Sequence, residues 1–165
     1  MKEIEGNLLD ITRGIIVHGC NCQGVMGSGV ALAVKTKYKE VFKAYSNTEP
    51  ALGRVVICTS VIDDVCEKYK MWVDQTLPKE LYIVNALTQN SYGSDGKRYV
   101  DYDAISACFY QVKMVAKELK LPVYFPLIGA GLGGGDWAEI SKRIDQVLGD
   151  EVEGILVKLP KVENL

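Results

Sequence analysis

Short runs of β-branched and aliphatic residues alternate with amphipathic segments along this chain, and this alternation limits the possible folds more than any other feature. Apolar runs predict strands at residues 15–17, 54–58, 81–84, 122–128 and 154–157. Apolar residues at spacings of three and four predict helices at residues 30–45, 105–119 and 137–148. The strand runs show little polar alternation, which is typical of strands covered on both faces. The pattern therefore predicts an α/β layer fold with a mainly parallel central sheet.

The segment from Val61 to Pro78 is the least regular part of the chain. It fits either the arm of a hairpin or a short helix inserted before the strand at 81–84. No internal repeat and no linker-like stretch divides the 165 residues. We therefore expect a single domain over residues 1–165, ending in a short polar tail at 158–165.

Charge and composition exclude several classes of protein. Nineteen basic and 21 acidic residues give a net charge of −2 and are interspersed, so we expect no sequence-specific binding to nucleic acid. No apolar run approaches the roughly 20 residues of a bilayer span, so we expect no membrane partner. Five cysteines without a C-x-x-C pair indicate a reducing environment, and the N-terminus shows no signal-like apolar segment. We expect a cytoplasmic monomer.

Ten of the sixteen glycines fall in two short windows, at residues 14–29 and 129–135. In an open α/β sheet, ligands bind beyond the carboxyl ends of the strands, where glycine lets the backbone approach an anion. The first window contains the predicted strand at 15–17, the second follows the predicted strand at 122–128, and each leads into a predicted helix, whose N-terminal amides would face the same space. A flexible turn would explain either window alone. Two windows at one end of the sheet favour a ligand that carries a diphosphate.

The motifs in and around these windows resemble those of one family, although neither window is a P-loop or a dinucleotide fingerprint. They are GNLL at 6–9, HGCNCQGVMGSGVA at 18–31 and PLIGAGLGGGDW at 126–137. On these motifs the chain resembles the macrodomains, which bind ADP-ribose. Within that family it is most similar to the ADP-ribose 1″-phosphate phosphatases of yeast and phages, near the ADP-ribosyl-glutamate hydrolases. The resemblance implies a three-layer α/β fold with a mixed, mainly parallel sheet between helices.

The resemblance also implies a set of ligand contacts. Asn7 and Leu8 would border the adenine, and Asn21 would meet the distal ribose. The two phosphate loops would consist of Gly27, Ser28, Gly29 and Val30, and of Ile128, Gly129, Ala130, Gly131, Leu132 and Gly133. The neighbouring hydrolases use a lysine after the third predicted strand and an aspartate in the second loop. Residues 84–88 contain no lysine and Gly133 replaces the aspartate, so we do not expect a lysine-adduct mechanism.

His18, the only histidine of the chain, follows a predicted strand at the start of the first window. An imidazole there could activate water or attack a phosphoryl group, and the phosphatases of the family resemble this arrangement. The alternative is a packed, hydrogen-bonded histidine at a strand end. The partner acid is expected to be Asp95, for which a turn residue is the alternative. Asp101 and Asp103 are further candidates, although each also fits a helix cap.

Other side chains near the windows have two interpretations each. Tyr92, Lys97 and Arg98 could meet a terminal phosphate or lie on a solvated surface. Trp137 could stack on a base or anchor the core. Cys20 and Cys22 alternate with His18, but a fourth ligand is missing, so we expect no metal and interpret both cysteines as packing residues.

The sequence therefore predicts a phosphatase that hydrolyses ADP-ribose 1″-phosphate to ADP-ribose and phosphate without metal or other cofactor. His18 and Asp95 would be its catalytic residues, and ADP-ribose and its 1″-phosphate would be its small-molecule partners. Two alternatives remain open. One is a reader that binds ADP-ribose without catalysis, and the other is an ADP-ribosyl hydrolase acting on modified protein or nucleic acid.

Overall fold

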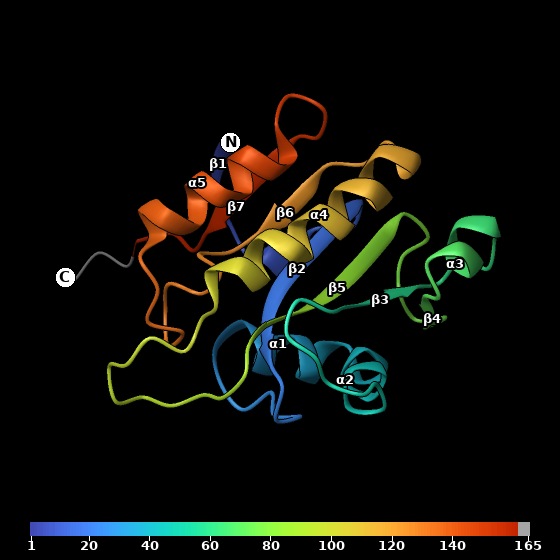
Figure 1. Ribbon diagram of the computed structural model, residues 1–165. Helices are drawn as coiled ribbons and strands as arrows, with labels where there is room; N and C mark the ends of the chain where they lie inside the picture. The colour runs from blue at the N-terminus through green and yellow to red at the C-terminus, as the bar shows by residue number, and fades with distance from the viewer. Residues whose placement is uncertain (162–165) are drawn as a thin grey trace.

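The computed structural model describes residues 1–161, which form a seven-stranded sheet with helices on both faces (Figure 1). Along the sheet the strands follow the order β1-β7-β6-β2-β5-β3-β4. All neighbours are parallel except β3 and β5, which are antiparallel. The strands are β1 (Lys2–Glu5), β2 (Gly14–Asn21), β3 (Val55–Thr59), β4 (Trp72–Val73), β5 (Leu81–Gln89), β6 (Val123–Phe125) and β7 (Gly154–Lys158). The expected mixed, mainly parallel sheet is confirmed.

Helices cover the sheet in two layers. They are α1 (Gly29–Lys37), α2 (Lys39–Ser46), α3 (Asp64–Lys68), α4 (Tyr102–Leu119) and α5 (Trp137–Leu148), with a 3-10 turn, η1, at Leu8–Asp10. The long helices α4 and α5 lie together on one face, and α1 and α2 lie on the other (Figure 1). The three-layer α/β architecture is therefore confirmed.

The central strands β2 and β5 connect two hydrophobic cores. Ile15 and Val17 of β2 face the core under α4 and α5, whereas Ile16 faces the core under α1 and α2. This follows from the two-residue period of a strand. Because both faces are covered, β2 has no polar alternation for most of its length.

Several local predictions differ from the structure. The helix predicted over residues 30–45 is two helices, because Tyr38 takes a non-helical conformation with φ −126° and ψ 80° between α1 and α2. Residues 61–78 contain the short helix α3, one of the two alternatives, together with the two-residue strand β4. The sequence did not predict β1 or β4, because both are short edge strands that bury few apolar side chains.

Both long helices begin at aspartates. Asp101 caps α4 and Asp136 caps α5, each accepting a hydrogen bond from a main-chain amide of the first turn. Within residues 1–161, no helix has both the length and the apolarity needed to cross a membrane. Residues 162–165, the end of the expected polar tail, lie outside the described residues.

Candidate functional site

A cavity of about 690 Å³ lies at the carboxyl ends of β2, β5 and β6. One wall is the first loop, residues 22–28, which leads into α1. The opposite wall is the second loop, residues 126–135, which leads into α5. Residues 92–94, from the connection between β5 and α4, line a third side. The two glycine windows thus meet at one sheet edge, as the sequence predicts.

The cavity is lined without charged side chains. Its lining residues are Gly19, Cys20, Asn21, Val25, Gly27, Ser28, Gly29, Val30, Ala31, Gln89, Tyr92, Gly93, Ser94, Pro126, Leu127, Ile128, Gly129, Ala130, Gly131, Leu132 and Gly133. An anion in this space would be held by main-chain amides and the positive end of a helix dipole rather than by lysine or arginine.

Amides are available for this purpose in both loops. Ser28, the N-cap of α1, makes no side-chain capping bond, so it does not occupy the first amides of the helix. Within residues 1–161, the hydrogen bonds outside helices and strands use neither the amides of Gly27–Gly29 nor those of Gly131–Gly133. Each loop therefore presents unpaired donors beside the cavity.

Side chains fix the first loop. Met26 turns into the core under α1 and α2 and is only 1% exposed. Asn21 holds the turn with both ends of its amide: Nδ2 donates to Val25 O at 2.8 Å, and Oδ1 accepts from Gln23 N at 2.9 Å. The Tyr45 hydroxyl, from α2, donates to Asn21 O at 2.5 Å.

Main-chain bonds fix the second loop. Gly133 O accepts from the amides of Tyr99 and Val100 at 2.7 and 3.0 Å, and Gly135 N donates to Gly129 O at 2.8 Å. A Cβ at Gly133 would lie 2.7 Å from Gly129 O, closer than real Cβ atoms come. Position 133 therefore has no room for a side chain unless the main chain of the loop shifts.

Most of the expected binding residues border this one cavity. These are Asn21, Gly27, Ser28, Gly29, Val30, Ile128, Gly129, Ala130, Gly131, Leu132 and Gly133. Asn7 and Leu8 lie outside the lining. Asn7 caps η1 by accepting a hydrogen bond from Leu9 N, and Leu8 is buried in the core under α1 and α2.

The expected position of His18 at the mouth of the cavity is wrong. Its side chain is fully buried, does not line the cavity, and shares a 2.6 Å hydrogen bond with Asn85 Oδ1 on the adjacent strand. Burial lowers the pKa of His18 to about 4, and the bond to Asn85 opposes this shift only in part. The ring is therefore neutral at pH 7, as in the alternative of a packed, hydrogen-bonded histidine.

The reason lies in the length of β2. The strand continues to Asn21 instead of ending near Val17, so His18 falls on the same face as Ile16 and Cys20 and points into the protein. Cys20 does line the cavity, and its sulfur is 3.8 Å from His18 Nε2. Burial raises the pKa of the Cys20 thiol well above its usual value, so the thiol is not activated.

Asp95 lies beside the cavity, next to the lining residue Ser94, but does not itself line it. Its Oδ1 accepts from the Tyr99 hydroxyl at 2.8 Å and from Lys97 N at 3.1 Å. The Tyr99 hydroxyl, with a further contribution from the Lys97 amide, lowers the pKa of the Asp95 carboxyl. The carboxylate is exposed and ionised, and the expected turn geometry is present as well.

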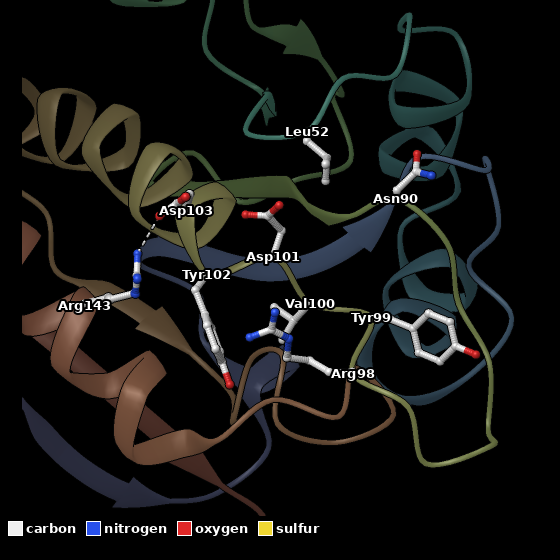
Figure 2. Close-up of a pocket in the computed structure, with 9 residues that line it drawn as sticks. All are labelled: Leu52, Asn90, Arg98, Tyr99, Val100, Asp101, Tyr102, Asp103 and Arg143. Atoms are coloured by element: carbon white, nitrogen blue, oxygen red, sulfur yellow. Dashed lines mark hydrogen bonds and ion pairs between the residues drawn. The ribbon is translucent and has the colours of Figure 1, made fainter.

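The remaining candidates lie elsewhere. Asp101 caps α4, and Asp103 pairs with Arg143 at 2.9 Å. Arg98 stacks on Tyr102, with its guanidinium carbon 4.4 Å from the ring centroid. These residues line a second cavity of about 390 Å³, formed in part by the β5–α4 connection (Figure 2). Of the other aromatic candidates, Tyr92 lines the main cavity and Trp137 packs against the core under α4 and α5.

Sequence reasoning missed part of the lining. Gln89, Gly93 and Ser94 form one side of the cavity, and Leu127 adds an exposed apolar edge. Because β5 continues to Gln89, the segment that follows it lies at the carboxyl ends of the strands, beside the cavity. The sequence gives no periodic pattern that predicts this part of the lining, because residues 90–99 have no regular structure.

Comparison with known proteins identifies relatives of the chain, although no family model matches. The chain is 31% identical over 146 residues to a DNA ADP-ribosyl glycohydrolase of Mycobacterium tuberculosis, covering 84% of this chain and 36% of the relative. It thus spans about a third of that protein. An uncharacterized 17.5 kDa protein of Enterobacteria phage T4 is 31% identical over 132 residues, covering 79% of this chain and 77% of the relative. A 46-residue segment is 48% identical to an ADP-ribose 1″-phosphate phosphatase of Aspergillus clavatus, covering 27% of this chain and 23% of the relative.

Solved structures of macrodomains are also similar to this chain. The macrodomain of Mycobacterium tuberculosis DarG superimposes with a TM-score of 0.74 at 25% identity, covering 97% of both chains. The macrodomain of Thermus aquaticus DarG superimposes with a TM-score of 0.72 at 25% identity, covering 96% of this chain and 97% of the other. The fold, the two glycine loops at one sheet edge and these relatives agree, and the chain belongs to the macrodomain family.

Proposed function

We propose that the cavity binds ADP-ribose with its diphosphate between the first and second loops. The observation that carries this proposal is the pair of opposed loops, each with unpaired main-chain amides beside an uncharged cavity of about 690 Å³. A diphosphate brings two negative charges close together. Two sets of amide donors, one of them at the N-terminus of α1, stabilise both charges without a metal or a basic side chain.

We further propose that the chain hydrolyses ADP-ribose 1″-phosphate. In this reaction water attacks the phosphorus, the bond between phosphorus and the ribose oxygen breaks, and that oxygen takes up a proton. Asp95 is the ionised carboxylate next to the lining residue Ser94, so we assign it the role of accepting the proton from water. The Aspergillus clavatus phosphatase supports this choice of substrate.

His18 has no part in this proposal as a base or nucleophile. Its ring lies beneath the cavity, and its Nε2 is occupied by Asn85. We propose instead that it supports the floor of the cavity through its contact with Cys20.

The test is phosphate release from ADP-ribose 1″-phosphate in the presence of a chelator. We expect turnover by the unchanged protein and a loss of about a hundredfold or more in Asp95→Asn, the low end of what a general base contributes. Asp103→Asn is the matched control, because Asp103 is an exposed carboxylate outside the cavity, and it should keep the full rate. Phosphate release at an equal rate from both variants would exclude Asp95 as the base. Binding of ADP-ribose without any phosphate release would identify a reader.

Hydrolysis of ADP-ribosylated DNA is the second candidate, favoured by the 31% identity to the Mycobacterium tuberculosis glycohydrolase over most of this chain. The absence of a lysine at residues 84–88 and the lack of room at Gly133 weigh against a lysine-adduct route. Incubation with an ADP-ribosylated oligonucleotide separates the two reactions. Release of ADP-ribose from the DNA, without phosphate release from the 1″-phosphate, would favour this second function.

A further inference from the structure

Tyr45 lies in the last turn of α2, far along the chain from both loops, yet it is buried against the start of the first loop. Its hydroxyl is 2.5 Å from Asn21 O and 3.0 Å from Asn21 Oδ1. A hydroxyl has a single proton, so it donates to one of these oxygens at a time. In both cases the contact fixes Asn21 relative to α2.

Asn21 in turn determines the course of the first loop. Its Oδ1 accepts from Gln23 N, with Val25 N a longer contact at 3.4 Å, and its Nδ2 donates to Val25 O. The side-chain amide therefore has both ends engaged within the protein. One of the two N–H groups of Nδ2 donates to Val25 O, and the other has no hydrogen-bond partner within residues 1–161, so the expected contact of Asn21 with the distal ribose stays a prediction.

The surroundings of the Tyr45 hydroxyl agree with this arrangement. Burial raises the pKa of Tyr45 above its usual range, and the main-chain amides of Gly24 and Val25 partly oppose the shift. One turn earlier, Val41 O accepts from Asn85 Nδ2 at 3.2 Å. The buried face of α2 thus makes two polar contacts, one turn apart, with the end of β2 and the middle of β5.

We propose that Tyr45 is a positioning residue for the diphosphate: through Asn21 it holds the first loop in the shape that presents the amides of Gly27–Gly29 to the ligand. This inference rests on the proposed function, because it requires that the first loop binds the diphosphate of ADP-ribose. No atom of Tyr45 needs to touch the ligand, and Tyr45 does not line the cavity. Its contribution is preorganisation, because a loop that is already ordered loses less entropy on binding.

The test compares Tyr45→Phe with Tyr38→Phe, a matched control. Tyr38 is buried in the same core, and its hydroxyl makes no hydrogen bond within residues 1–161. Amide hydrogen exchange at Gln23 and Val25 should accelerate about tenfold or more in Tyr45→Phe, while the amide of Ile16 in β2 keeps its rate. The Kd for ADP-ribose should rise about tenfold, since one hydrogen bond is worth roughly that factor. Tyr38→Phe should change neither quantity.

Two results would overturn the inference: unchanged exchange at Gln23 and Val25 in Tyr45→Phe, or equal acceleration at Ile16, which would mean general loss of stability. The Asn21→Ala background provides a second check, because adding Tyr45→Phe there should produce little further exchange at Val25. If the unchanged protein does not bind ADP-ribose, the proposed function fails, and the exchange rates still decide whether Tyr45 holds the loop.

Discussion

Both loops bury one apolar side chain, Met26 in the first and Ile128 in the second, but the hydrogen bonds that hold them differ: a side chain makes those of the first loop, whereas main-chain groups make those of the second. In the first loop, Met26 inserts into the core and Asn21 bonds the turn from within. In the second loop, Gly133 O and Gly129 O accept main-chain amides, and no side chain of the loop takes part in these bonds. Two glycine-rich loops at the carboxyl ends of the strands are thus held in place by different kinds of hydrogen bond.

The glycines themselves differ in the same way. A Cβ added at Gly24 or Gly29 would meet nothing within 4 Å, although both have positive φ. In the second loop, a Cβ at Gly133 or Gly135 would overlap the main chain at Gly129. Glycine at 24 and 29 therefore supplies conformation, and glycine at 133 and 135 supplies close approach of one backbone segment to another.

The largest expected effect comes from placing a side chain in the second loop. In Gly134→Ala the new Cβ would overlap Lys97 O at a residue with φ +69°, so overpacking and backbone strain add. We expect the free energy of unfolding to fall by about 4 kcal/mol, measured by denaturant unfolding. Gly27→Ala in the first loop meets only Val25 Cγ1 at 3.4 Å and should change stability by less than about 0.5 kcal/mol. Equal losses of stability in the two variants would contradict the claim that only the second loop needs glycine for close backbone packing.

Removing the apolar anchor of the first loop should have the next largest effect. Met26→Ala leaves a cavity in the core under α1 and α2, and we expect a loss of about 3 kcal/mol in the same measurement. Leu132→Ala is the exposed control from the second loop: its side chain is 57% exposed, unlike that of Ile128 in the same loop, and the change should cost less than about 0.5 kcal/mol. An equal loss for Met26→Ala and Leu132→Ala would contradict the role of Met26 as a buried anchor.

Acid should destabilise the strand that leads into the first loop. The pKa of His18 falls from 6.5 to about 4 on folding, so below pH 6.5 the unfolded chain takes up a proton that the folded protein does not. The contribution of His18 is complete above pH 6.5 and is lost as the pH falls towards 4, by about 2 kcal/mol at pH 5. Unfolding at pH 7 and pH 5 measures this loss. His18→Gln should show a smaller loss over the same range, and identical losses in both proteins would contradict the assignment.

The sequence predicted those parts of the site that depend on local pattern. Glycine windows between predicted strands and helices located the two loops, because parallel strands bring their carboxyl ends to one edge. The orientation of His18 depends on the continuation of β2 by four residues, to Asn21, which an apolar run ending at Val17 does not reveal. The contact of Tyr45 with Asn21 joins residues 24 positions apart and has no local signature.

Amide chemical shifts during a titration with ADP-ribose test the central claim most directly. If the diphosphate lies between the two loops, the amides of Gly27–Gly29 and of Gly131–Gly133 should shift together with a single Kd, and those of β1 and β7 should not move. Shifts confined to one loop, or no saturable shift in either, would contradict the proposal that both loops hold one diphosphate.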